Sequence, residues 1–205
     1  MTVRTAAQAL DLVRQSGLVG MTTTGSLPSL VQAVVGGPVK GSWWGHPKGK
    51  LVFNLGEALH DSPEVLVTKL AGGKVTFVHV ALWPALYRVV TDDAWRLRAK
   101  DRVGPDARRL LARVERAGEA RLDELGEHLE APARRLLGKT KDELEKAVLV
   151  QSESLHTERG SHTTRLRSWR SWASAETRQA AAALDFDRAL AVLEAASCGA
   201  PLGLR

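Results

Sequence analysis

Hydrophobic residues recur at helical spacing three times within the first 60 positions of the chain. The first stretch, 5–16, places alanine, leucine and valine on one face and stops at Gly17. The second follows Pro28, expected at the first helical position, and the third runs from Pro47 to the break at Asp61. Apolar residues three and four positions apart indicate amphipathic helices with one buried face. Three helices are therefore expected here.

Between residues 65 and 79 the pattern changes to alternation. The runs VLVTKL and KVTFVHV flank Ala71-Gly72-Gly73. Alternating apolar residues indicate strands, and adjacent glycines supply the positive φ angles of a tight turn. The sequence thus predicts a hairpin after the three helices, with Lys69 and Lys74 beside its turn. His79, among valines, is expected to be satisfied within the sheet rather than to bind a metal.

The same order of elements is expected again after a basic segment. Residues 82–90 suit a short connecting helix, and nine basic residues between Arg96 and Arg121 indicate a linker, with a new helix starting after Gly104-Pro105. Helical spacing follows Asp106 and then Asp123, which is expected to be an N-cap. Thr140 with Glu143 matches a capping box, which predicts that a third helix begins there.

Residues 148–172 predict a second hairpin. A tight turn is expected at 158–161, and Arg165, Arg167 and Arg170 follow it on the returning strand. The alanine-rich segment after it predicts one or two helices. The expected fold is therefore α+β, with two tandem units of three helices plus a hairpin, and a C-terminal helix. We expect domains at 1–100, 101–173 and 174–205.

Charge and cysteine usage narrow the expected environment. The chain has 205 residues, a net charge of +6 and an estimated pI near 9.8, which favours polyanionic partners such as nucleic acid. No apolar run approaches the ~18 residues that span a bilayer, and the N-terminus lacks a signal-peptide apolar core, so a cytoplasmic protein without membrane contact is expected. The single cysteine, Cys198, allows no intrachain disulfide.

The basic residues of the second unit's third helix and hairpin are candidate DNA contacts. Such a helix would point its N-terminal part at the major groove while basic side chains meet phosphate. The candidates are Arg134, Arg135, Lys139, Lys141, His156, Arg159, His162, Arg165 and Arg167. The alternative is a solvated helix terminus whose charges are balanced by Asp142, Glu143 and Glu145.

The segment SWWGHPKGK, residues 42–50, sets two tryptophans among histidine and lysines. Trp44 could stack on a base or wedge into a duplex while lysines, among them Lys48, hold phosphates. In the alternative interpretation the tryptophans seal the space between two elements. That alternative is favoured for Trp43, whereas both stay open for Trp44.

In its order of elements the chain resembles tandem winged-helix proteins, and more distantly the bacterial winged-helix DNA glycosylases that remove alkylated or crosslinked bases. Those glycosylases are longer and carry a Gln-x-Asp or Gln-x-Gln signature, where this chain has Gln151-Ser152-Glu153. The resemblance implies that Gln151 could orient a water molecule, that Glu153 or Glu158 could be the carboxylate, and that Trp44 could fill the space left by an extruded base. Alternatively, these glutamates are charge partners of neighbouring arginines.

Other chemistry is not indicated. His156, His162 and Glu158 could approach one another across the hairpin, but ligands on an exposed turn are weak evidence for a metal, so neither metal nor cofactor is expected. Phosphate-cradling glycine loops and the Gly-x-Ser-x-Gly elbow are missing from the sequence.

Together these patterns predict a protein that binds duplex DNA mainly through phosphate contacts of its second unit. About six such contacts would give a slope of log affinity against log salt near −5. The alternatives are a DNA repair glycosylase and a winged-helix protein-interaction scaffold. The C-terminal helix is expected to pack on the domains or to form the contact of a homodimer.

Overall fold

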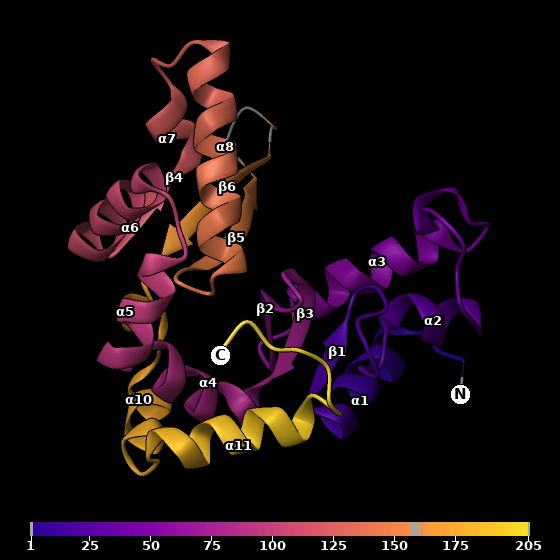
Figure 1. Ribbon diagram of the computed structural model, residues 1–205. Helices are drawn as coiled ribbons and strands as arrows, with labels where there is room; N and C mark the ends of the chain where they lie inside the picture. The colour runs from indigo at the N-terminus through magenta and orange to yellow at the C-terminus, as the bar shows by residue number, and fades with distance from the viewer. Residues whose placement is uncertain (1, 157–159, 161, 205) are drawn as a thin grey trace. The chain divides into compact units, whose positions relative to one another are not determined.

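The computed structural model describes residues 2–156, 160 and 162–204. The chain divides into two compact units: unit 1 holds residues 1–86 and 187–203, and unit 2 holds residues 87–186 and Leu204. Helices make up 55% of the chain and strands 17%, in two antiparallel sheets, so the expected α+β class is confirmed. Figure 1 shows the elements along the chain.

Unit 1 begins with three helices and a short strand, followed by a hairpin. In chain order these elements are α1 (Ala6–Ser16), β1 (Leu18–Gly20), α2 (Leu30–Val35), the short 3-10 helix η1 (Trp43–Gly45), α3 (Gly49–His60), β2 (Val65–Ala71) and β3 (Lys74–His79). The sheet has the antiparallel order β1-β3-β2. A second 3-10 helix, η2 (Val80–Leu82), leads into α4 (Trp83–Val90), and α11 (Phe186–Ala196) returns the chain to this unit.

The apolar stripes found in the sequence form the core of unit 1. Val13 of α1, Val34 of α2 and Val52 of α3 are fully buried against Phe77 of the sheet. The expected glycine turn is also present, with φ of 57° and 69° at Gly72 and Gly73. The predicted helices and hairpin of this half are confirmed.

The start of α2 differs from the expectation. Ser29 is the N-cap, and its hydroxyl accepts a hydrogen bond from the Gln32 N–H at 3.3 Å. Pro28 therefore precedes the helix and does not occupy its first position. A serine oxygen satisfies an unpaired N–H of the first turn, which proline cannot do, so the cap decides where the helix begins.

Unit 2 repeats the order of elements seen in unit 1. Its elements are α5 (Asp93–Asp101), α6 (Pro105–Ala117), β4 (Glu119–Arg121), α7 (Leu122–Gly126), α8 (Ala131–Lys146), β5 (Gln151–His156), β6 (His162–Arg167), α9 (Trp169–Trp172) and α10 (Ala175–Ala182). The sheet order is β4-β6-β5, the counterpart of β1-β3-β2. Apolar side chains of α6, α8 and β6, among them Leu111, Leu144 and Leu166, are buried in this unit.

The basic segment expected to be a linker is helix α5. Asp92 caps it by accepting a hydrogen bond from the Trp95 N–H at 3.0 Å, and the Trp95 side chain is 1% exposed. Two of its basic residues, Arg96 and Lys100, form ion pairs with Glu115 of α6. Charge density was a misleading sign of a linker here, because a cap and one buried indole hold the segment as a helix.

Two expected caps in unit 2 are wrong. Thr140 is buried and lies in the middle of α8, which starts nine residues earlier. The Glu143 carboxylate does not cap this helix but accepts a hydrogen bond from the Gly104 N–H, at 3.1 Å, at the start of α6. Asp123 lies in the first turn of α7, whose N-cap is Arg121. A capping pattern inside a continuous helix cannot act as a cap because the N–H groups there already have intrahelical partners.

The compact units do not follow the expected domain limits of 1–100, 101–173 and 174–205. Residues 87–101 belong to unit 2, and the C-terminal segment is divided, with α10 in unit 2 and most of α11 in unit 1.

Candidate nucleic-acid interface

Helix α8 has a buried half and an exposed half. Residues 131–136 and Lys139 are exposed, and Leu136 keeps 50% of its surface accessible, whereas Thr140 and Leu144 are buried. The first half of α8 thus stands out from the core of the unit, with its side chains accessible to a partner.

The exposed half of α8 carries three basic residues and no acidic one. These residues are the predicted contacts Arg134, Arg135 and Lys139. Nη2 of Arg134 donates hydrogen bonds to the carbonyls of Gly126 and Leu129, at 3.4 and 3.0 Å, which holds the guanidinium at the end of α7. We call residues 131–139 the basic half-helix.

Lys141, the fourth basic candidate of α8, has counter-charges on the same helix. Its Nζ lies 3.1 Å from the Asp142 carboxylate and 3.3 Å from that of Glu145. Local neutralisation of this kind is what the alternative interpretation of the helix terminus expected. The alternative interpretation therefore holds for the buried half of α8. The basic half-helix contains no acidic residue along its own length.

The arginines of the second hairpin lie in ion pairs. Arg165 stands directly opposite Glu153, and its Nη2 lies 2.7 Å from Oε2 of that glutamate. Glu119 of β4 lies 3.8 Å from Arg165 and 3.9 Å from Arg167. The hydrogen bond that Arg165 donates to Glu153 raises the pKa of the Arg165 guanidinium despite partial burial. Two arginines therefore meet two glutamates on this sheet.

The two candidate catalytic residues lie side by side on β5. Gln151 is 6% exposed, and its amide donates to the Ser152 carbonyl at 2.8 Å, while Glu153 pairs with Arg165. A pocket of about 310 Å³ exists in unit 2, lined by residues of α5, α6 and α9, and neither Gln151 nor Glu153 lines it. The structure therefore gives Glu153 a charge partner, as the alternative interpretation expected.

The tip of the second hairpin is only partly described. His156 and His162 are opposite each other in register, and Gly160 has a φ of 73°. The candidates Arg159 and Glu158 lie outside the described residues. Within residues 2–156, 160 and 162–204, three or more His, Cys, Asp or Glu side chains are nowhere grouped so as to hold a metal ion.

The tryptophan segment of unit 1 forms an exposed aromatic cluster. Trp43 and Trp44 are stacked, with ring centroids 4.3 Å apart and an interplanar angle of 22°, and Phe53 of α3 lies 5.5 Å from Trp44. Trp44 is 63% exposed and Phe53 41%, whereas Trp43 packs partly against the core. The sequence prediction omitted Phe53, although it falls outside the buried stripe of Val52, Leu55 and Leu59.

Lys48, another predicted contact, has a structural role beside this cluster. Its Nζ donates to the carbonyls of Val34 and Val35, at 2.9 and 3.1 Å. A cation at the C-terminal end of α2 satisfies carbonyls that lack intrahelical partners and complements the helix dipole. Its ammonium is therefore directed at the protein backbone.

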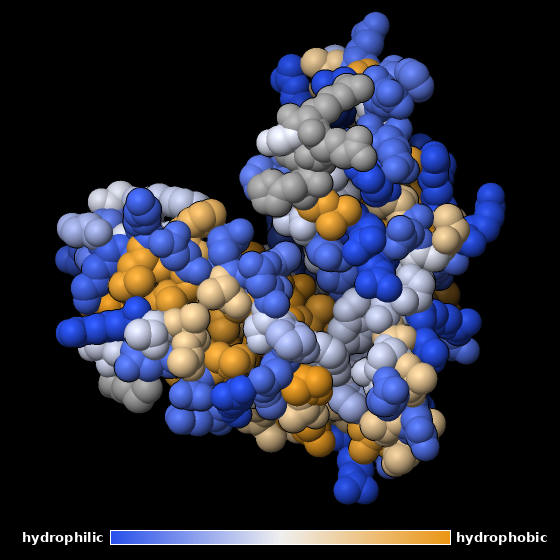
Figure 2. Space-filling view, turned by 180° about the vertical axis from the view of Figure 1, so that it is seen from behind, coloured by the Kyte–Doolittle hydropathy of each residue, from blue (hydrophilic) through white to orange (hydrophobic). Residues whose placement is uncertain are grey.

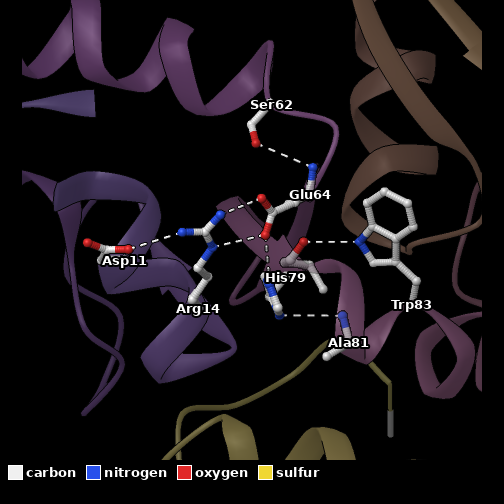
Figure 3. A network of polar contacts seen from close by, with 8 residues as sticks. Asp11, Arg14, Ser62, Glu64, His79, Ala81 and Trp83 are labelled. Atoms are coloured by element: carbon white, nitrogen blue, oxygen red, sulfur yellow. Dashed lines mark hydrogen bonds and ion pairs between the residues drawn. The ribbon is translucent and has the colours of Figure 1, made fainter. Parts of the chain in front are cut away.

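A network of polar contacts ties α1 to the hairpin of unit 1 (Figure 3). Glu64 accepts two hydrogen bonds from the Arg14 guanidinium, at 2.9 and 2.5 Å, and its carboxylate lies 3.5 Å from Nε2 of His79. The Ala81 N–H donates to Nδ1 of His79 at 3.4 Å. The Arg14 guanidinium lowers the pKa of Glu64. His79 is thus satisfied within the fold, as expected, and this cluster is structural.

Two further findings are negative. Among the residues that the structure covers, α-helices long and apolar enough to cross a membrane were not found. Comparisons with models of known protein families, with curated proteins and with solved structures found no match for this chain.

Proposed function

We propose that both units are winged helices and that the protein binds duplex DNA through the basic half-helix of unit 2. The observation that carries the proposal is the three exposed basic side chains of residues 131–139, which follow the N-cap Glu130 on the third helix of a unit with helix-strand-helix-helix-hairpin order. In winged helices the third helix is the element that enters the major groove, and basic side chains near its start meet phosphates.

Strand order supports the winged-helix assignment. In each unit the short strand after the first helix pairs with the last strand of the hairpin, giving the orders β1-β3-β2 and β4-β6-β5. That pairing joins the first helix to the hairpin, and in unit 2 the first half of the third helix is exposed.

The hairpin of unit 2 is a secondary part of the proposed surface. Arg165 and Arg167 already face Glu119 and Glu153, so their contact with phosphate requires those ion pairs to rearrange. Arg135 and Lys139 have no acidic residue within the basic half-helix, whereas Arg134 would have to release its Nη2 from the Gly126 and Leu129 carbonyls. We therefore assign most of the salt-dependent affinity to the basic half-helix.

The test is a titration of a labelled random-sequence duplex of about 25 base pairs at several salt concentrations. Each phosphate contact contributes about 0.9 to the slope of log affinity against log salt, so replacing three contacts should flatten the slope by about 2.7 and weaken binding about 500-fold at 0.1 M salt. The variant is Arg134→Ala/Arg135→Ala/Lys139→Ala.

The matched control removes three of the four exposed arginines of α6, in the same unit: Arg108→Ala/Arg113→Ala/Arg116→Ala. The two triple variants have the same net charge, so a general electrostatic effect would act on both alike. The proposal requires a much larger loss in the α8 variant. Equal losses, or failure of the unaltered protein to bind at low salt, would contradict it.

The same samples test the two alternative functions, a DNA repair glycosylase and a protein-interaction scaffold. If damaged duplexes accumulate abasic sites and Glu153→Gln stops this without weakening binding, the protein is a glycosylase that acts through β5. If neither binding nor base release is found, the two units serve protein contacts instead.

A further inference from the structure

Trp44 is presented on a rigid support rather than on a loose loop. The His46 N–H donates to the Trp43 carbonyl at 3.1 Å, and the Gly49 N–H to the His46 carbonyl at 2.7 Å. The Lys48 N–H donates to Nδ1 of His46 at 3.1 Å, while its ammonium anchors the segment to α2. The orientation of the indole is thus set before any ligand arrives.

Gly49 makes this winding possible. A Cβ at this position would lie 2.8 Å from the carbonyl oxygens of both Trp43 and Trp44, closer than real Cβ contacts. The backbone of the tryptophan segment therefore folds directly onto the first turn of α3. Because Trp43 stacks on Trp44 and packs partly against the core, it fixes the ring from one side.

The sequence before and within this cluster is basic, and its nearest acidic residue is Glu57, four positions after Phe53 on α3 and so on the same side of that helix. Residues 12–56 contain Arg14, three lysines and no aspartate or glutamate. Arg14 and Lys48 are engaged within the protein, but Lys40 and Lys50 are exposed. Lys50 and Phe53 are three positions apart on α3, so they share one side of that helix.

We propose that Trp44, with Phe53 and Lys50 of α3, is a stacking platform for an unpaired base of single-stranded DNA. Aromatic rings bind bases of any sequence through their π-faces, and neighbouring lysines hold the phosphates. A purely apolar partner would not use the lysines, whereas a nucleic-acid strand uses both features. This site lies in unit 1 and does not depend on the basic half-helix of unit 2.

The test is binding of a labelled 15-nucleotide oligothymidine, which has no duplex structure, measured by fluorescence anisotropy. Trp44→Ala should weaken binding roughly 5- to 150-fold, the loss expected for one stacked base. Trp44→Phe keeps an aromatic face and should retain most of the affinity. Lys50→Ala should weaken binding about 5-fold at 0.1 M salt, because one phosphate contact on a single strand contributes about 0.7 to the salt slope.

Two controls separate this site from the proposed duplex site. Leu97→Ala removes a side chain of similar exposure, 64%, from α5 and should leave oligothymidine binding unchanged. The triple α8 variant should keep oligothymidine binding while it loses duplex binding. If oligothymidine does not bind, if Trp44→Ala binds as tightly as the unaltered protein, or if Trp44→Phe loses as much as Trp44→Ala, the stacking platform is wrong. A change of sedimentation mass in Trp44→Ala would overturn it in favour of a contact between two copies of the chain.

Discussion

The two hairpins, of β2 and β3 and of β5 and β6, hold the same place in their units but are stabilised differently. Most side chains of β2 and β3 are buried, and residues 201–203 cover the β2 edge: Gly72 donates to the Pro201 carbonyl and Gly203 to that of Leu70, at 3.0 and 2.9 Å. In β6 only Leu166 is buried, and ion pairs cross its sheet. One chain topology therefore supports an apolar hairpin with a covered edge and a charged hairpin.

The difference extends to the whole of each unit. Residues 87–186 carry 20 basic and 17 acidic side chains, whereas residues 1–86 with 187–203 carry 8 and 6. The visible face of unit 1 shows a patch of hydrophobic residues, while that of unit 2 is mostly hydrophilic (Figure 2). Because most charges of unit 2 have partners, an unbalanced stretch such as the basic half-helix is more informative than the total charge.

The largest expected effect follows from truncating one core residue in each unit. Phe77→Ala in unit 1 and Trp169→Ala in unit 2 each remove a side chain that is 1% exposed, and each should lower the free energy of unfolding by about 3–5 kcal/mol. Trp169 also loses the hydrogen bond from its indole N–H to the Val148 carbonyl at 2.8 Å. Amide hydrogen exchange should show reduced protection in the altered unit. Equal loss of protection in both units would mean that they unfold as one body.

A smaller change in the free energy of unfolding is expected from glycine-to-alanine substitutions in the third helix of each unit, α3 and α8. Gly49→Ala in α3 places a Cβ against two carbonyl oxygens and should cost about 1–3 kcal/mol, as overpacking does. Gly138→Ala in α8 meets nothing within 4 Å and should stabilise the helix by about 0.5–1 kcal/mol. Urea denaturation measures both changes.

Gly56→Ala in α3 is the matched control for this pair. Its Cβ would meet only the end of the flexible Met21 side chain, at 2.8 Å, which can move. We expect a loss well below that of Gly49→Ala. If Gly138→Ala destabilises the protein instead, the first half of α8 does not have the open surroundings described above.

The helices and hairpins could largely be predicted because each has its own local pattern. Stripes of apolar residues placed α1, α3 and α6, and glycines placed the turn at 72–73. The misplaced start of α2 was a local error, since its cap joins Ser29 to Gln32, whereas two other failures depend on contacts that are distant in sequence. Glu143 binds Gly104, 39 positions away, and Trp95 anchors α5 in the core, so no local pattern could reveal either.

The residue types of the candidate site could be predicted from the sequence, but the pairs of side chains that face each other could not. The sequence singled out Arg165, Glu153 and Trp44 as residue types suited to DNA chemistry. It could not tell that Arg165 and Glu153 face each other across two strands, because that depends on the register of the hairpin. The exposure of Phe53, by contrast, could have been predicted, because this residue falls outside the apolar stripe of Val52, Leu55 and Leu59.

The smallest expected effect concerns the carboxylate that ties α7 to β6, the counterpart of Glu64 in unit 1. Hydrogen bonds from the Arg121 guanidinium, at 2.7 and 3.2 Å, and from the Thr163 hydroxyl, at 3.0 Å, lower the pKa of Asp123 from 3.8 to about 2. A carboxyl whose pKa is lower in the folded state stabilises the protein above its unfolded pKa. This stabilisation should disappear as the pH falls from about 4 to about 2.

The unaltered protein should therefore lose stability more steeply than Asp123→Asn across that interval. The difference should be modest because the carboxylate is exposed to solvent and water screens its ion pair. An NMR titration of the side-chain carboxyl gives the native pKa directly, and Arg121→Met should move it back towards 3.8, since the guanidinium is the largest cause of the shift. If Asp123 titrates near 3.8 in the unaltered protein, the hydrogen bonds from Arg121 and Thr163 do not form in solution. Unit 2 would then lack the carboxylate anchor that Glu64 gives unit 1.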